Sequence, residues 1–274
     1  MSSPGPVEPG YDINDSVKIQ GRDEVQLNDR SLAALRLRRA LSAVGGGQQT
    51  LLAPGAGAGR YARAIARYRP GWKIVAGDLS SRAVEEAIRY GGGPWYSVFD
   101  AENIPFDSRS FDSVVFFDLL EHVPNPDRLL TECFRVLRPG GLLHFFVPLE
   151  AQPRTLYSLL DDNRPIPIHE WKRDHVGHIQ RFRDQDVLGL VWYSGLHVEE
   201  SAYSFHLIGQ IHDLLDYWQR DRNRGGGGLL PLPAVNAICR AAFILTWRGA
   251  YLEDRLYDGP ILASGLHVTA RRPE

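Results

Sequence analysis

The feature that most constrains this chain is a glycine-rich turn between two short apolar runs. Residues 50–53 (Thr-Leu-Leu-Ala) form the first run, and residues 54–59 (Pro-Gly-Ala-Gly-Ala-Gly) follow it directly. Residues 60–69 then carry apolar side chains at helical spacing, and residues 73–77 form a second strand-like run that ends at Asp78. A strand, a glycine loop, a helix and a strand in this order predict an open α/β sheet.

The same segment predicts a site for a nucleoside-containing cofactor. Glycines at alternate positions (Gly55, Gly57, Gly59) let the main chain turn sharply and bring its N–H groups against a ligand at a helix N-terminus. Asp78, at the tip of the next strand, can hold both hydroxyls of a ribose. The dinucleotide fingerprint requires a third glycine at position 60, where this chain has Arg60. The turn alone therefore does not say which nucleoside is bound.

Several later motifs follow at regular intervals, and their order indicates a family. They are the apolar run 95–99 ending in Asp100-Ala101-Glu102, then Ile-Pro-Phe at 104–106, Ser-Phe-Asp and an apolar strand at 110–117, and Arg-Val-Leu-Arg-Pro-Gly-Gly at 135–141. From about Leu51 to Val147 the chain resembles class I S-adenosylmethionine-dependent methyltransferases, in the branch of the ubiquinone-biosynthesis O-methyltransferases. The resemblance predicts an α/β fold: a Rossmann-like, seven-stranded, mostly parallel sheet with helices on both faces.

This resemblance implies S-adenosyl-L-methionine as the cofactor. It places Gly55, Gly57 and Gly59 beside the methionine part, Asp78 on the ribose, and Asp100 and Ala101 beside the adenine. The complete predicted cofactor set is Gly55, Ala56, Gly57, Gly59, Asp78, Leu79, Asp100, Ala101 and Asp118. The chain departs from the family at Ala53, where an acidic residue is usual, and at Ala56, where a cysteine is frequent. The missing acid removes one anchor for the cofactor's ammonium group.

The chain is expected to form one elaborated domain. Residues 1–28 are an N-terminal arm, and residues 29–201 together with 265–274 form the cofactor-binding core. Two insertions, 149–182 and 202–264, leave the sheet at the carboxyl ends of strands, where open α/β sheets bind their ligands. We interpret them as a lid over the acceptor pocket, with a helical part inserted before the last strand and an irregular part over 149–175.

Composition narrows the classes of partner. A formal net charge of −2 and 43% hydrophobic residues give no basic face for general nucleic-acid binding. Cys133 and Cys239 lack metal-ligand spacing, so a reducing cytoplasm is expected. The chain has no signal-like N-terminus and no uncharged apolar run of about 18 residues.

One apolar segment, 234–251, leaves three interpretations open. It is interrupted by Asn236, Arg240 and Thr246, so it is too short and too polar to span a bilayer. It can pack on the core, make a peripheral membrane contact, or form a homodimer contact.

The acceptor side is expected after the strand 113–117. Methyl transfer is a displacement at a sulfonium carbon, so the protein must position an acceptor and remove its proton. Asp118, Glu121 and His122 follow this strand at positions that share one face of a helical turn. They resemble the Glu-x-x-Glu-His segment of metal-assisted ubiquinone-type enzymes, with Asp118 at the first Glu. The resemblance implies a divalent cation (Mg or Zn) on Asp118, Glu121 and His122, while the alternative is that Glu-His only caps the following helix.

His178 is the favoured general base. It lies in a Gly-His-Ile-Gln-Arg-Phe run (residues 177–182) that relatives place beside the acceptor, and imidazole can take a proton at neutral pH. The predicted catalytic set is His178, His122 and Glu121.

The sequence thus predicts a cytoplasmic enzyme that methylates a small, largely apolar acceptor. Transfer to oxygen on a phenol, quinol, sugar or natural-product scaffold is the first choice, with transfer to carbon or nitrogen open. Two further alternatives are a cyclase or pericyclic catalyst that retains the cofactor, and a non-catalytic scaffold, for which Ala53 is the hint.

Overall fold

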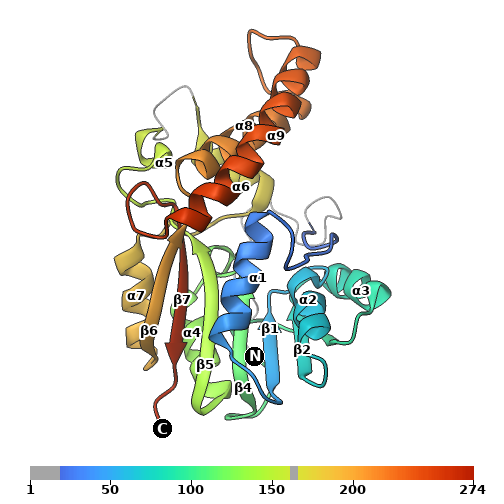
Figure 1. Cartoon of the computed structure of the whole chain (residues 1–274), viewed down its shortest axis with the longest axis vertical. Coiled ribbons are helices and arrows are strands. Elements are labelled where there is room, and N and C mark those ends of the chain that lie inside the picture. The colour runs from blue at the N-terminus through green and yellow to red at the C-terminus, as the bar shows by residue number, and fades with distance from the viewer. Residues whose placement is uncertain (1–18, 161–165) are drawn as a thin grey trace.

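The strands pair into one sheet, in the order β3-β2-β1-β4-β5-β7-β6 (Figure 1). The computed structural model describes residues 19–160 and 166–274. The strands are β1 (Thr50–Pro54), β2 (Lys73–Asp78), β3 (Trp95–Val98), β4 (Phe111–Phe117), β5 (Leu137–Pro148), β6 (His197–Ser204) and β7 (Gly265–Arg271). Strands β1 to β5 pair in parallel, and β7 runs antiparallel to both β5 and β6. The predicted fold class is confirmed.

Helices cover both faces of the sheet and its upper edge. In the described ranges they are α1 (Leu32–Ala43), α2 (Arg60–Tyr68), α3 (Ser81–Tyr90), the 3₁₀ turn η1 (Leu120–His122), α4 (Pro126–Val136), α5 (Leu156–Leu159), α6 (Ile168–Val176), α7 (Asp184–Tyr193), α8 (Leu207–Asn223) and α9 (Leu232–Leu256). Successive strand side chains point to opposite faces. Leu52 and Val114 pack with α4 and α7, whereas Leu51 and Val115 pack with α1, α2 and α3. This alternation gives two hydrophobic cores.

Helix starts follow from side-chain caps. Ser31 accepts a hydrogen bond from the Ala34 amide at 3.2 Å, and Ser80 accepts one from the Ala83 amide at the same distance. Each hydroxyl satisfies an amide that has no partner within its own helix. Helix α1 therefore begins at Leu32, directly after its cap.

A helical layer (α5, α6, α8 and α9) lies beyond the carboxyl ends of the parallel strands (Figure 1). The expectation of an irregular segment over 149–175 is wrong, because α5 and most of α6 lie there. Thr155 caps α5, and Ile168, Lys172 and His175 of α6 are buried at helical spacing. Residues 1–18 of the predicted arm lie outside the described residues. No helix in the described ranges combines the length and the apolarity that crossing a bilayer requires.

Two buried histidines lie side by side on the face of the sheet that α1 covers. His144 of β5 and His267 of β7 have ring centroids 5.7 Å apart, and His144 Nδ1 contacts Thr269 Oγ1 at 2.9 Å. Burial, with Arg39 as a second cause, lowers the pKa of His144 to about 3. Burial lowers the pKa of His267 well below its usual value, together with His144, Arg36 and Arg39. Both imidazoles are therefore neutral in the folded protein at ordinary pH.

We expect the free energy of unfolding to decrease as pH falls from about 6.5 toward 3. In this window the unfolded chain protonates His144 and the folded protein does not, so the unfolded state binds more protons. At pH 5 this difference amounts to about 2 kcal/mol for His144 alone. Urea unfolding gives the free energy of unfolding at pH 7 and at pH 5. The decrease between these two pH values should be smaller by that amount in His144→Asn than in the unchanged protein. Equal losses in the two proteins would contradict the neutral state of His144.

Candidate active site

The glycine loop joins β1 to α2 and has the backbone that its sequence requires. Gly55, Gly57 and Gly59 have φ values of +64°, +55° and +88°, a region that favours glycine. A Cβ on Gly55 would lie 2.6 Å from Leu119 Cδ1, and one on Gly59 would lie 2.6 Å from the Tyr96 hydroxyl oxygen. Both glycines are therefore required by close neighbours as well as by the turn.

The N-terminal segment lies directly on this loop. The Ala58 amide donates to the Gln20 carbonyl at 2.8 Å, and a Cβ on Gly57 would lie 2.6 Å from the same oxygen. From the sequence alone, replacing Gly57 by valine is expected to block the cofactor without unfolding the protein. The structure adds a different consequence, because a side chain at Gly57 would also displace residues 19–21. The sequence carries no local signal for this long-range contact.

Asp78 fixes the tip of β2 against the glycine loop. Its Oδ2 accepts from the Gly57 amide at 2.8 Å, and its Oδ1 accepts from the Ser80 amide at 3.0 Å. Burial raises the pKa of Asp78, while these amides act against that shift. A carboxylate has about four lone-pair sites. The amides of Gly57, Ser80 and Leu79 use part of this capacity, and the carboxylate can still accept a ribose hydroxyl.

The residues predicted beside the adenine lie at two neighbouring strand ends. Asp78 pairs with Val98 at the ends of β2 and β3, and the Phe99 amide donates to the Asp78 carbonyl at 3.2 Å. Leu79, next to Asp78, is 55% exposed, although it is a large apolar side chain. Asp100 and Ala101 follow β3 at the same edge. The structure thus brings the predicted ribose and adenine residues together.

Asp118 is engaged by a residue that the sequence did not point to. It directly follows β4 with a φ of +49°, and its Oδ2 accepts from Arg36 Nη1 of α1 at 2.6 Å. The Arg36 guanidinium also lies 3.6 Å above the Phe146 ring. The carboxylate of Asp118 is therefore held by α1, and it is not among the residues whose donor atoms lie within 4.8 Å of one another.

That cluster consists of Glu121, His122 and His178. Glu121 and His122 belong to η1, and the Glu121 carbonyl accepts from the Ile179 amide at 2.9 Å and the Gln180 amide at 3.1 Å. These bonds hold the segment after α6 against η1. Glu121 Oε1 lies 3.8 Å from Nε2 of His122 and 3.8 Å from Nε2 of His178. The three residues predicted as catalytic thus lie together, although 57 positions separate Glu121 from His178.

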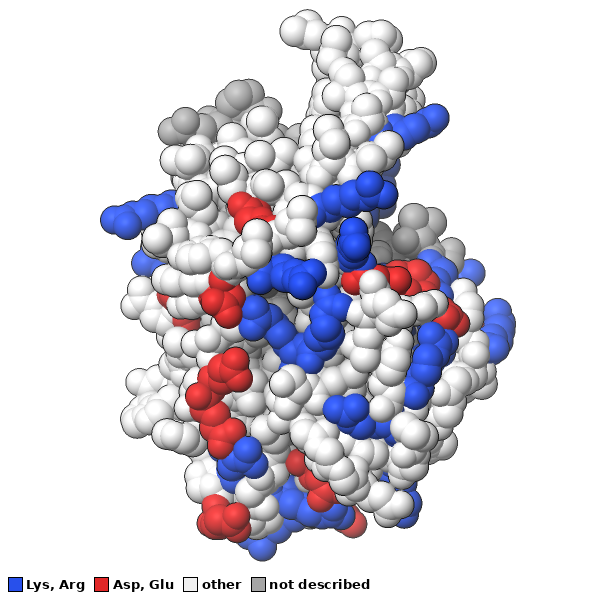
Figure 2. All heavy atoms as spheres, in the orientation of Figure 1, with Lys and Arg blue, Asp and Glu red and all other residues white. Residues whose placement is uncertain are grey.

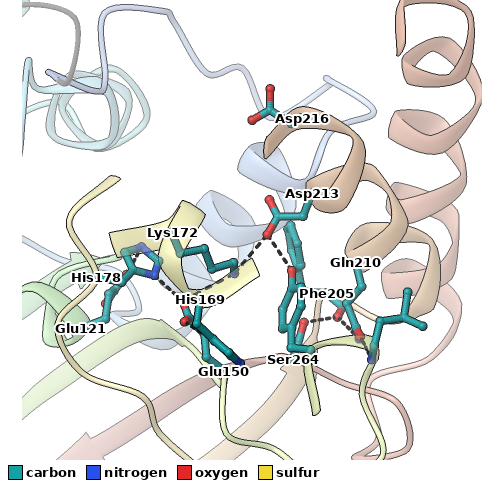
Figure 3. Close-up of polar contacts among 12 residues, drawn as sticks. Glu121, Glu150, His169, Lys172, His178, Phe205, Gln210, Asp213, Asp216 and Ser264 are labelled. Atoms are coloured by element: carbon teal, nitrogen blue, oxygen red, sulfur yellow. Dashed lines mark hydrogen bonds and ion pairs between the residues drawn. The ribbon is translucent and has the colours of Figure 1, made fainter. Parts of the chain in front are cut away.

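A chain of buried charges connects this cluster to the helical layer (Figure 3). His178 Nδ1 forms a short hydrogen bond with Glu150 Oε1. Lys172 of α6 lies 3.5 Å from Glu150 and 3.1 Å from Asp213 of α8. The Tyr157 hydroxyl of α5 donates to Asp213 at 2.6 Å. Helices α5, α6 and α8 are therefore joined to the cluster through paired charges.

The protonation of these groups follows from burial and charge. Burial, with the nearby Asp118 carboxylate, raises the pKa of Glu121 well above its usual value. Burial and the neighbouring His178 lower the pKa of His122 to about 3. Burial alone would raise the pKa of Glu150, but Lys172 and His178 hold it well below its usual value. Glu150 is thus a carboxylate at neutral pH, and His122 is a neutral imidazole.

Glu150 and Lys172 are the residues that sequence reasoning missed. Glu150 follows β5 by two positions, just as Asp78, Asp100 and Asp118 stand at the ends of β2, β3 and β4. An acidic residue at the carboxyl end of a parallel strand was therefore an available signal. Lys172 offered no comparable signal, because its partners come from β5 and α8.

The comparisons with known proteins agree with the fold. A family model described as a methyltransferase domain matches residues 52–145. A ubiquinone/menaquinone biosynthesis C-methyltransferase from Desulfotalea psychrophila is 33% identical over 135 residues, which cover 48% of this chain and 50% of the relative. A ubiquinone biosynthesis O-methyltransferase from Coxiella burnetii is 25% identical over 163 residues, which cover 56% of this chain and 69% of the relative.

A solved structure has the same fold over nearly the whole chain. The [4+2]-cyclase SpnF superposes with a TM-score of 0.58 at 22% identity, covering 96% of this chain and 86% of that one. The curated match, by contrast, spans only half the length of the first relative. The matched segment contains the glycine loop, Asp78, Asp100 and the Glu121–His122 pair. Over this matched segment the chain is similar to the class I S-adenosylmethionine-dependent methyltransferases.

Proposed function

We propose that this protein transfers the methyl group of S-adenosylmethionine to a hydroxyl oxygen of a small, largely apolar acceptor. The observation that carries the proposal is the arrangement of two sets of residues at one edge of the sheet. The glycine loop and Asp78 follow β1 and β2, and the Glu121–His122–His178 cluster lies after β4. Parallel strands that end at one edge place a cofactor and its acceptor next to each other.

The chemistry required of the chain is modest. The cofactor supplies the electrophilic methyl group when it is bound. The acceptor oxygen forms a bond to the methyl carbon, the carbon–sulfur bond breaks, S-adenosylhomocysteine leaves, and the hydroxyl gives up its proton. The protein's part is to align the acceptor and to lower the cost of losing that proton.

His178 is placed for the second task. Its Nδ1 contacts Glu150 Oε1, and an ionised carboxylate can only accept a hydrogen bond. Nδ1 therefore carries the hydrogen, and the basic lone pair of His178 is on Nε2, directed toward Glu121. This arrangement is the reason for choosing a hydroxyl acceptor, because a base at this position can take the hydroxyl proton as the oxygen attacks the methyl carbon.

The helical layer is proposed to act as the lid. Tyr157 of α5, Ile168 of α6 and Tyr217 of α8 share one apolar cluster. Lys172 links this cluster electrostatically to Glu150 and hence to His178. An apolar acceptor held under these helices would be close to the base.

Transfer can be separated from the two alternative functions by one incubation. The protein is mixed with cofactor labelled in its methyl group and with phenolic, quinol, sugar and polyketide acceptors. Labelled product together with an equal amount of S-adenosylhomocysteine supports transfer. Product without S-adenosylhomocysteine indicates a cyclase or a related catalyst, and a protein that binds no cofactor is a scaffold.

The second proposal concerns the segment 234–251, which we assign to contact with an anionic membrane surface. Ile244, Leu245 and Trp247 are exposed on α9 (61%, 75% and 41%). The arginines of α9 (Arg240, Arg248 and Arg255) are all exposed as well. Its two acidic residues, Glu253 and Asp254, instead accept hydrogen bonds from the start of α8 and the residues before it. In Figure 2 the surface over the helical layer that contains α9 is mostly uncharged, and Lys or Arg side chains lie along it.

An apolar face with arginines suits anionic lipid better than a second copy of itself, because the arginines of two copies would repel. The double variant Ile244→Asp/Leu245→Asp should lose co-sedimentation with phosphatidylcholine vesicles that contain phosphatidylglycerol. Ile88→Asp, at an exposed position of α3, is the control and should keep it. Equal sedimentation of all three proteins, or a dimer in analytical ultracentrifugation that the double variant abolishes, would contradict the membrane assignment.

A further inference from the structure

Glu121 is a buried carboxyl group whose two oxygens have no hydrogen-bond partner among the described residues. Its side chain is fully buried, 0% exposed. Leaving a buried acceptor without a partner costs roughly 1–3 kcal/mol, and more for a charged group. A structure keeps such a group only where something else compensates for it. The position of Glu121 therefore points to a ligand that the chain itself does not provide.

The two nearest side chains are imidazoles, and each has its Nδ1 already engaged. His122 Nδ1 contacts the Gly177 carbonyl oxygen at 3.0 Å, and His178 Nδ1 contacts Glu150. A carbonyl and an ionised carboxylate only accept, so both Nδ1 atoms carry hydrogen and both Nε2 atoms present a lone pair. Each Nε2 lies 3.8 Å from Glu121 Oε1. Two lone pairs thus converge on a carboxyl group to which neither can donate.

This arrangement is that of metal ligands supported by a second layer of hydrogen bonds. Histidines that bind a metal through one nitrogen almost always donate the other N–H to a carboxylate or a backbone carbonyl. The three donor atoms lie within 4.8 Å of one another. Ligand atoms about 2.1 Å from a common ion are roughly 3.0–3.4 Å apart, so side-chain shifts of about 1 Å would close the site.

We propose that Glu121, His122 and His178 bind one divalent cation of the group that accepts imidazole, such as Zn²⁺, Mn²⁺ or Fe²⁺. Two nitrogen donors and one oxygen donor disfavour Mg²⁺, which prefers oxygen ligands throughout. The proposed set differs from the predicted one at one position, because Asp118 is held by Arg36 and His178 takes its place. Three ligands leave coordination positions open for a further ligand.

The open positions suggest a role, which rests on the proposed function. A hydroxyl of the acceptor bound there would lose its proton to solvent more readily, because a cation lowers the pKa of a bound oxygen. The resulting oxyanion then forms the bond to the methyl carbon as the carbon–sulfur bond breaks. His178 Nε2 would in that case hold the cation instead of the proton.

Glu150 is assigned as a positioning residue of this site. It holds the ring of His178, and Lys172 keeps Glu150 ionised. Changing such a supporting carboxylate typically lowers metal affinity by about 10–100-fold. We expect a decrease of this size for Glu150→Gln. The ligands themselves should be more sensitive than Glu150.

Metal binding is tested on the chelator-treated full chain by titration calorimetry with ZnCl₂, MnCl₂ and MgCl₂, and by the visible absorption of the Co²⁺ form. We expect one Zn²⁺ per chain and weaker Mg²⁺ binding. Glu121→Gln, His122→Ala and His178→Ala should each lose the high-affinity event and the Co²⁺ spectrum. Asp118→Asn and His197→Ala, at an exposed residue of β6, should keep both. Far-ultraviolet circular dichroism and the thermal midpoint show whether each variant is folded.

Several results would overturn the inference. They are the absence of stoichiometric Zn²⁺ binding, unchanged binding in the three ligand variants, Mg²⁺ affinity equal to that of Zn²⁺, and a loss in Asp118→Asn as large as in His178→Ala. Failure of the proposed function gives a different pattern, in which the cation binds but no acceptor is methylated. If the chelated protein transfers methyl groups at the full rate, the cation has no catalytic role and methyl transfer stands.

Discussion

The variant His178→Ala is expected to lower the rate of methyl transfer by about 10²–10⁴-fold, the usual contribution of a positioned group that handles a proton. His178 is the one side chain in the cluster that a buried, ionised carboxylate orients, through the contact between Nδ1 and Glu150. Removing the imidazole leaves the glycine loop, Asp78 and Asp100 unchanged, because they lie at the ends of β1, β2 and β3 and not in the segment that carries His178. The loss should therefore appear in kcat and not in the affinity for S-adenosylhomocysteine.

The measurement is steady-state transfer from labelled cofactor to the acceptor found by the incubation described above. His197→Ala is the matched control, because it removes an exposed imidazole of β6 and should retain full activity. Glu150→Gln should lie between the two, since it keeps the imidazole but weakens its orientation. A rate for His178→Ala within a factor of a few of the unchanged protein would remove this residue from the chemistry.

Asp78→Ala is expected to weaken binding of S-adenosylhomocysteine by about 1.5–3 kcal/mol, which corresponds to roughly 10–150-fold in Kd. The carboxylate has acceptor capacity left for a ribose hydroxyl, and it also holds the Gly57 amide at 2.8 Å. Alanine removes both contributions. Asp78→Asn keeps one acceptor oxygen and should therefore fall between alanine and the unchanged protein.

Calorimetry with S-adenosylhomocysteine gives the affinity of the unchanged protein and of each variant. The thermal midpoint without ligand shows whether each variant is folded. The affinity should fall in the order aspartate, asparagine, alanine. Equal affinity in all three proteins would mean that the ribose lies elsewhere. A large fall in the ligand-free thermal midpoint would mean that Asp78 serves mainly to hold the loop.

The parts of the fold that the sequence predicted are those that local patterns encode. Apolar runs ended by acidic residues predicted the parallel strands. In the structure both faces of such a run are buried, with Leu51 in one core and Leu52 in the other. The glycine loop and Asp78 were predicted because positive φ and a strand-end acid each demand a particular residue type.

The parts that escaped prediction depend on contacts between distant segments. Arg36 meets Asp118 across 82 positions, and His178 meets Glu150 across 28. Nothing in the sequence around Asp118 shows that α1 will supply its partner, so it was placed in a metal set with its sequence neighbours. Lys172 is similar, because burying an ammonium group is favourable only once Glu150 and Asp213 lie beside it.

The most direct test of the account is titration of the full chain with S-adenosylhomocysteine in a calorimeter, followed by crystallisation of the complex. We expect one molecule per chain, with its ribose on Asp78, its adenine beside Leu79 and Ala101, and its sulfur on the side facing His178. No heat at millimolar ligand, or a ligand bound away from the glycine loop, would contradict the account.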